Sequence, residues 1–243
     1  MKYYFFISFF IFSYCTFSQD FFQTPPGTIK VNNSLYIDKA PIDNLMYLEF
    51  IMSVEYLWNY TLNDSLKSLK LKDINKSLLS SSLNPNENKR IYDEINFVED
   101  IKISSKVHIN DYFNHPHYYN HPVVGIKKNL AQLYCIWRTD MVNMLWSQKI
   151  KGFKKQYKKI KYRLPTIKEY ETARKTFQTN KKLFIFDKSS PLDLNFKSIR
   201  NKDVFALYNA SEFTSSKNYL TQNLSNKNKE KYTFFRCVCE LDN

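Results

Sequence analysis

The chain has 243 residues, enough for one domain with a buried core, and it carries a formal net charge of +13. Only six of its 36 basic residues are arginines, and residues with A/T-rich codons are abundant. Because arginine is the residue that favours bidentate phosphate recognition, we interpret the charge as a solvated basic surface and expect no nucleic-acid partner. With three glycines in all, the chain has no Gly-rich phosphate-binding loop.

Residues 1–18 have the pattern of a Sec signal peptide. One lysine precedes an apolar run that is too short for a comfortable membrane span, and the small residues Thr16 and Ser18 suit cleavage after Ser18. Lipidation of Cys15 is the alternative, although a bulky tyrosine stands where small residues are usual. We therefore expect an exported protein of the periplasm or cell envelope, with membrane association only if Cys15 is lipidated, and a single domain over residues 19–243.

The first half of the mature chain predicts a hairpin, a helix and an irregular segment. Residues 25–44 indicate two short strands joined by an Asn-Asn turn. A helix is expected in "LMYLEFIMSVEYLWNY", and a Ser-, Asn- and Lys-rich stretch around residues 61–110 indicates an irregular, partly exposed insertion. The apolar residues in step along that helix are Leu45, Leu48, Ile51 and Met52.

A histidine-rich stretch, "NHPHYYNHPVVG", precedes the next predicted helix. Its histidines are His115, His117 and His121, and the flanking prolines and tyrosines favour a packed aromatic loop over a metal site. A long helix is predicted from Lys128 through "NLAQLYCIWRTDMVNMLWSQKI", and a basic stretch follows it. The apolar stripe of this helix consists of Leu130, Leu133, Tyr134, Trp137 and Met141.

The segment "YRLPTIKEYETAR" predicts a sharply defined helix start. Thr166 at the N-cap and Glu169 three residues later form a capping box, in which each side chain bonds the other residue's backbone amide. Tyr170 and Ala173 then fall on one face of the helix. Beyond it, "LFIFD", "DVFALYN" and "YTFFRCVCEL" are short strand candidates.

Removal of the signal peptide leaves three cysteines, Cys135, Cys237 and Cys239. An oxidising compartment favours one disulfide with one thiol left over, while three buried thiols are the alternative. Cys237 and Cys239 share a strand face. Without a histidine at ligand spacing, the cysteines do not predict a zinc site.

Four segments in this order resemble the formylglycine-generating enzymes, or sulfatase-modifying factors. They are "PPGTIKVNNSLYIDKAPIDNLMYLEF", "HPVVGIKKNLAQLYCIW", "YRLPTIKEYETARK" and "FFRCVCE". The resemblance implies an α+β fold related to C-type lectins, with short strands, a few helices and much irregular structure. The stretch "YFNHPHYYNHPVVG" and the "WRT" after Cys135 are further similar to gliding-motility and type IX secretion envelope proteins of the Bacteroidetes. Members of that subgroup are generally regarded as structural.

The departures from the family pattern concern its chemistry. The enzymes carry two active-site cysteines shortly before the closing Arg-Cys strand, where a thiolate pair holds copper; the corresponding stretch here, "TSSKNYLTQNLSNKNKEKYTFF", has no cysteine. The motif that supplies a structural calcium in relatives is shortened to "ALYNASEFT", which keeps Asn209 and Glu212. We therefore expect no catalytic residues, no metal and no cofactor.

The resemblance also implies a disulfide between Cys135 and Cys237, with Cys239 as the competing, second-ranked partner. The resulting expectation is a catalytically silent module of the cell envelope that is structural or binds envelope proteins, with gliding or secretion components as candidate partners. An active formylglycine-generating oxidoreductase and a lectin-like carbohydrate or peptide binder are the alternatives.

Overall fold

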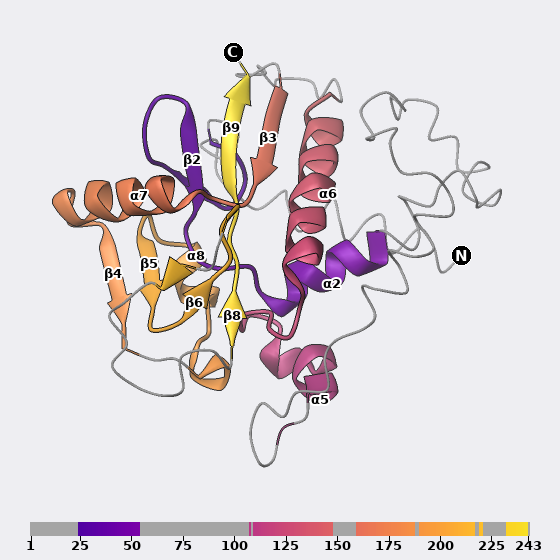
Figure 1. Cartoon of the computed structure of the whole chain (residues 1–243). Helices are drawn as coiled ribbons and strands as arrows, with labels where there is room; N and C mark the ends of the chain where they lie inside the picture. The colour runs from indigo at the N-terminus through magenta and orange to yellow at the C-terminus, as the bar shows by residue number, and fades with distance from the viewer. Residues whose placement is uncertain are drawn as a thin grey trace.

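The computed structural model of the chain describes residues 24–53, 107, 109–147, 159–187, 190–216, 219–220 and 232–242. The predicted signal peptide and most of the predicted insertion around residues 61–110 lie outside these ranges. The described part has the expected α+β architecture, with small sheets flanked by helices (Figure 1). None of its helices combines the length and the apolar character needed to cross a membrane.

The central sheet joins the two ends of the described chain. It has the order β1-β2-β9-β3 and is antiparallel throughout, so the C-terminal strand lies between an early and a middle strand. Tyr36 and Tyr162 both stand opposite Cys239, one on each side of it. The strands are β1 (Thr28–Lys30), β2 (Leu35–Asp38), β9 (Val238–Asp242) and β3 (Lys159–Arg163).

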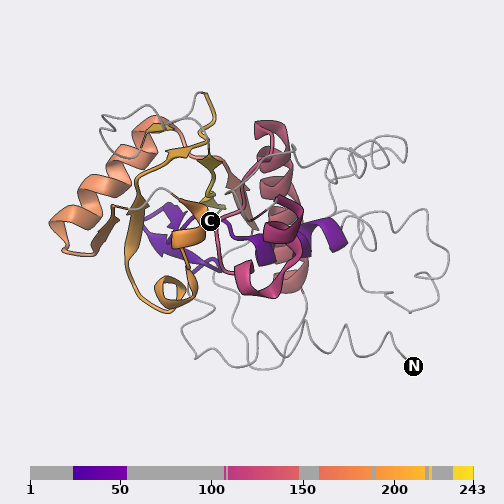
Figure 2. The same cartoon turned by 90° about the horizontal axis from the view of Figure 1, so that it is seen from below.

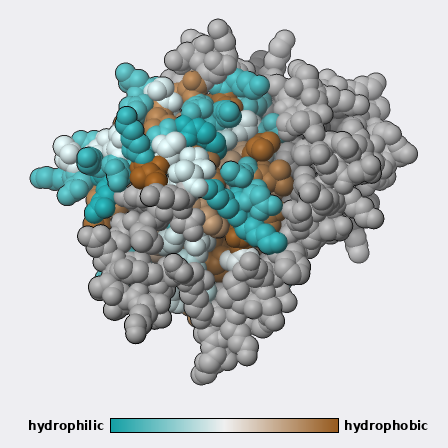
Figure 3. All heavy atoms as spheres, in the orientation of Figure 1, coloured by the Kyte–Doolittle hydropathy of each residue, from teal (hydrophilic) through white to brown (hydrophobic). Residues whose placement is uncertain are grey.

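Helices cover both faces of this sheet (Figures 1 and 2). On one face, α6 (Lys128–Ser147) and α2 (Asn44–Ser53) enclose an aromatic core, and on the other α7 (Ile167–Thr179) packs with β5. The first core includes Tyr47, Phe50, Tyr134, Trp137 and Tyr162, and the second includes Ile29, Ile37, Tyr170, Phe177 and Phe205. Hydrophilic residues gather over the outer end of α7, at the left of Figure 3.

Two smaller sheets and several short helices complete the described fold. In one sheet β4 (Leu183–Phe186) runs parallel to β5 (Phe205–Tyr208). In the other, β6 (Ser211–Glu212) lies between β7 (Tyr219–Leu220) and β8 (Thr233–Phe234). The short helices are α5 (Ile109–Asn114), η4 (Pro116–Tyr118), η5 (Pro191–Asp193) and α8 (Lys197–Arg200).

Several local predictions are confirmed. The β1–β2 hairpin forms, and its turn is fixed by Asn32, whose Oδ1 accepts from the Ser34 and Leu35 amides, each at 3.0 Å. The capping box of α7 is complete, with Thr166 and Glu169 in both reciprocal bonds. Helix α6 begins at Lys128 as predicted, and its stripe faces the core: Leu130, Tyr134 and Trp137 are buried and Leu133 and Met141 partly so.

The predicted core face of α2 is wrong. Leu45 and Met52 are 38% and 36% exposed, whereas Tyr47 and Phe50 are fully buried. Tyr47 lies 5.4 Å from Phe50 and 6.1 Å from Tyr134 between ring centroids, so large rings rather than aliphatic side chains fill the space under α6. Leu48 and Ile51 pack only at the margin of this core.

Two further boundaries differ from the sequence prediction. The end of the basic stretch before "LPT" is the strand β3, in which Lys159 and Lys161 are exposed while Ile160 and Tyr162 are buried; residues 148–158 lie outside the described ranges. This alternation is stabilised by pairing with β9. At the end of the predicted insertion, residues 109–110 already belong to α5.

Candidate functional site

The motif residue Glu212 lies in a buried ion pair. Glu212 and Arg236 are both 0% exposed, and Arg236 donates from Nη2 to Oε1 and from Nε to Oε2, each at 2.7 Å. The Tyr170 hydroxyl donates a third bond to Oε1 at 2.9 Å. Arg236 also donates to the Ala206 carbonyl at 2.9 Å, so its positive charge is surrounded by acceptors. The carboxylate of Glu212 thereby joins β6 to Tyr170 of α7 and to Arg236, and Arg236 extends the connection to β5.

This geometry does not fit the calcium that the family resemblance implies. Both Glu212 oxygens already accept charge-assisted hydrogen bonds, and a cation would have to displace Arg236 from them. Asn209, the other retained motif residue, has a buried Oδ1 atom that accepts no hydrogen bond. Glu212 is therefore part of the architecture, and its oxygens are not available to a cation.

The three cysteines lie inside the core between α6 and the central sheet. Cys135 is 1% exposed, and Cys237 and Cys239 are 0% exposed. Their burial raises the pKa of Cys237 well above its ordinary value and that of Cys239 to about 12. A copper-binding thiolate pair has to be ionised and reachable by substrate, so these buried thiols do not fit that cofactor either.

Two of these cysteines are neighbours. The Sγ atoms of Cys135 and Cys237 are 3.0 Å apart, although the sequence positions differ by 102. Cys239 directs its thiol to the Glu240 carbonyl at 3.7 Å. All three are present as thiols, so the Cys135–Cys237 disulfide stays a prediction.

A second buried ion pair holds the loop before β1. Arg138 of α6 donates from Nη1 and Nη2 to the two carboxylate oxygens of Asp38, each at 2.9 Å, and from Nη2 to the Pro26 carbonyl at 2.6 Å. Its guanidinium carbon lies 4.2 Å from the centroid of the Tyr162 ring. Gly27 has φ 76°, and a Cβ there would approach Arg138 to 3.0 Å, so this loop needs glycine.

The prediction of a packed histidine loop holds for His121 only. His121 is buried, and its Nδ1 lies 2.9 Å from the Pro191 carbonyl; since a carbonyl only accepts, this nitrogen carries the proton. Burial lowers the pKa of His121. His115 and His117 are exposed. Within the described ranges, no three His, Cys, Asp or Glu side chains are grouped so that they could hold a metal ion.

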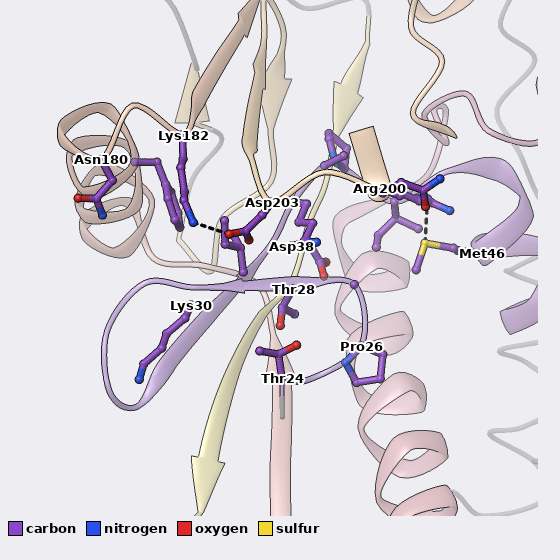
Figure 4. Close-up of a pocket in the computed structure, with 18 residues that line it drawn as sticks. Thr24, Pro26, Thr28, Lys30, Asp38, Met46, Asn180, Lys182, Arg200 and Asp203 are labelled. Atoms are coloured by element: carbon purple, nitrogen blue, oxygen red, sulfur yellow. Dashed lines mark hydrogen bonds and ion pairs between the residues drawn. The ribbon is translucent and has the colours of Figure 1, made fainter. Parts of the chain in front are cut away.

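A cavity of about 820 Å³ lies between the β1–β2 hairpin, the C-terminal end of α7 and α8 (Figure 4). Its cationic lining residues are Lys30, Lys39, Lys182 and Arg200. Lys182 is paired with Asp203, and Arg200 donates to Met46 Sδ at 3.0 Å, as the dashed lines in Figure 4 indicate.

The cavity retains positive charge after its internal pairs are counted. Arg200 is neutralised by the buried Asp43, at 2.5 Å, and Lys182 by Asp203. Lys30 is exposed and Lys39 half-buried, and burial lowers the pKa of Lys39, an effect that Lys182 strengthens and Asp203 opposes. The lining offers charge for a carboxylate or phosphate group. Among the described residues that line it there is no cysteine, serine or histidine, and the carboxylates of Asp38 and Asp203 are held in ion pairs.

The residues predicted from the sequence are thus assembled into the framework rather than around this cavity. The capping-box residue Glu169 also accepts from Arg163, which in turn binds Glu240 on β9. Burial opposes ionisation of Glu169, but Arg163 and the Thr166 bonds outweigh it and hold its pKa at about 2. Sequence reasoning assigned no role to Arg138, Arg163 or Arg236, although each stands in a quoted family segment or beside one.

Comparison with models of protein families gives a match that covers nearly the whole chain. Residues 12–235 match the Sulfatase-modifying factor enzyme 1-like domain. No curated protein and no solved structure matches the chain significantly.

Proposed function

We propose that this chain, which belongs to the sulfatase-modifying factor enzyme 1-like family, is a catalytically silent member that acts in the cell envelope as a structural or binding module. Export rests on the signal-peptide pattern of residues 1–18. The link to gliding or type IX secretion partners rests on the sequence similarities around "YFNHPHYYNHPVVG".

The burial of the cysteines is the observation that most directly supports a lack of catalytic activity. The chemistry of the enzymes needs two thiols that ionise, bind copper and meet a substrate thiol. In this chain the cysteines outside the predicted signal peptide are at most 1% exposed. As thiols, Cys237 and Cys239 have pKa values raised by burial, which disfavours the thiolates that copper needs, and the predicted Cys135–Cys237 disulfide would remove Cys237 as a ligand altogether.

The structural role of Glu212, which belongs to the shortened family motif, supports the same proposal. Glu212 balances the charge of Arg236 in the core, so it has a structural reason to be present without any catalysis. A binding role is favoured over a purely structural one by the cavity beside Lys39, which offers uncompensated positive charge to a partner's acidic group.

An activity assay tests the proposal. Exported, processed protein is incubated with copper, oxygen and a sulfatase-type cysteine peptide, and aldehyde formation is followed by mass spectrometry, with an active formylglycine-generating enzyme as positive control. We expect no turnover above that of Cys237→Ser and Cys239→Ser variants. Turnover that those substitutions abolish would establish the oxidoreductase alternative.

The partner is sought separately. Affinity capture of the protein from envelope extracts is compared with capture by a Lys39→Glu, Lys30→Glu variant, which reverses charge at the cavity. Recovery of gliding or secretion components by the unmodified protein alone would support the binding role. Specific retention on a glycan array, insensitive to these substitutions, would favour a lectin-like binder instead.

A further inference from the structure

The strands of the β4–β5 sheet differ sharply in exposure. All four residues of β5 are buried. In β4 the central residues Phe184 and Ile185 are 45% and 54% exposed, the two largest exposures among the large hydrophobic side chains of the described ranges. The two side chains alternate, so apolar surface is presented on both faces of one strand.

Within the described ranges, the outer edge of the β4 backbone has no pairing strand. The parallel register pairs Leu183 with Phe205, and the Phe205 amide donates to the Lys182 carbonyl at 2.9 Å. In a parallel ladder this pattern directs the amide and carbonyl groups of Phe184 to β5 and those of Leu183 and Ile185 away from it. No other strand of the described ranges pairs with β4.

The opposite edge of the same sheet is closed. The Ala206 amide of β5 donates to the Lys39 carbonyl, and the Ala206 carbonyl accepts from Arg236, both at 2.9 Å. New strands can therefore be added only at β4. Natural edge strands are usually guarded by charged residues or proline within the strand, and "LFIF" has neither.

We propose that β4 pairs with β4 of a second copy of this chain, antiparallel about a two-fold axis at Phe184. In this register Phe184 stands opposite Phe184 of the second copy, and Leu183 stands opposite Ile185. The outward amides and carbonyls of Leu183 and Ile185 then bond each other across the axis. The result is a four-stranded sheet, β5-β4-β4-β5, in place of two two-stranded ribbons that are marginal by themselves.

The side chains around this axis are self-complementary. Phe184 lies 4.6 Å from Phe186, which stacks on Tyr208 at 4.9 Å between ring centroids, so an aromatic row ends at the axis and would continue into the second copy. Lys181 and Asp187 stand three positions before and after Phe184, and both are exposed. The same register places Lys181 opposite Asp187 of the second copy.

The net charge of +13 works against any self-association. At physiological ionic strength charges more than about 8 Å apart are screened, so the local Lys181–Asp187 contact dominates there. A four-residue edge buries less surface than the roughly 800 Å² per partner of a standard interface. We therefore expect a Kd of about 10 to 100 µM.

Site-specific crosslinking tests the register. Residues opposite each other in a non-hydrogen-bonded antiparallel pair have Cα atoms about 4.5 Å apart, a separation that a disulfide bridges. Oxidised Phe184→Cys protein should therefore become a covalent dimer, and Ile185→Cys, whose own counterpart is diagonal, should crosslink far less. Equal crosslinking of the two variants, or none of Phe184→Cys, would overturn the two-fold register.

Analytical ultracentrifugation of the exported protein tests the association itself. We expect a concentration-dependent dimer that Ile185→Lys weakens at least tenfold, while Ile136→Lys, at an exposed apolar position on α6, leaves it unchanged. Circular dichroism melts confirm that both variants are folded. A protein that stays monomeric at about 1 mM, or a dimer that survives Ile185→Lys, would overturn the proposal.

The charges of Lys181 and Asp187 provide an independent test of the dimer. Lys181 has φ 54°, a conformation that aspartate tolerates better than most residues. Lys181→Asp and Asp187→Lys should each weaken the dimer, and the double variant should restore it. If the single substitutions leave dimer affinity unchanged, or if the double variant dimerises more weakly than both single variants, then the two positions do not meet.

Discussion

Replacement of Glu212 by glutamine is the sharpest test of the buried framework. The substitution keeps the size of the side chain but removes the charge that balances Arg236. The glutamine oxygen can still accept a hydrogen bond from Arg236. The new amide nitrogen is itself a donor, so it cannot accept the hydrogen bond from the second Arg236 N–H group. Arg236 is then a charged group with 0% exposure and no counter-charge in contact.

The expected loss follows from that burial. Breaking a fully buried ion pair by removing one partner costs about 3 to 5 kcal/mol, because the remaining charge stays desolvated. Solvent screening does not reduce the figure here, since both side chains have no exposed area. Removal of both charges in a Glu212→Gln, Arg236→Met variant should cost clearly less than the two single losses added together.

Urea unfolding followed by tryptophan fluorescence measures these losses. Asp203→Asn provides the matched control, because it breaks an ion pair with Lys182 whose side chains are 63% and 46% exposed, and such pairs contribute at most about 1 kcal/mol. The reasoning fails if Glu212→Gln is no more destabilising than Asp203→Asn. That result would mean that Arg236 finds water or another acceptor when its partner is neutral.

Three further outcomes are expected. Thr166→Ala should lower stability by about 1 kcal/mol through the loss of the N-cap, and an unchanged thermal melt would contradict the capping box. The folded pKa of Glu169 is about 2, below its ordinary 4.5, so the stabilisation that it provides is complete above pH 4.5 and disappears as the pH falls towards 2. Glu169→Gln should flatten the dependence of unfolding free energy on pH over that window. An unchanged slope would argue against the Arg163 contact. Non-reducing peptide mapping of native protein should find Cys135 joined to Cys237, a crosslink that could contribute about 4.7 kcal/mol in the chain-entropy model. A linkage through Cys239, or three alkylatable thiols, would refute the pairing.

Local sequence patterns predicted those elements whose determinants lie within a few residues. The turn at Asn32 and the capping box at Thr166 are each fixed by side chains that bond backbone two or three positions away. The stripe of α6 was predictable because its apolar residues alternate with polar ones at helical spacing. These features need no knowledge of the rest of the fold.

The errors arose where a distant partner decides the structure. Helix α2 is apolar on nearly every side, so periodicity could not choose between its aliphatic face and the face of Tyr47 and Phe50 that meets Tyr134. The pattern of β3 becomes a strand through its pairing with β9, about 80 positions away. Likewise, nothing near Arg138 in the sequence indicates that its partner is Asp38.

The ion pairs give a physical account of why the segments that resemble the family lie together in this chain. Asp38, Glu169 and Arg236 lie in the first, third and fourth of the similar segments, and Arg138 directly follows the second. In the fold these segments meet: β2 and β3 both pair with β9, and α6 packs across the same sheet. In this chain the charged residues therefore join the segments that build the sheet, whether or not a reactive thiol lies nearby. None of these contacts involves a cysteine side chain other than those of the core, so the catalytically silent protein that we propose would keep the same framework, with β4 and the cationic cavity available for binding.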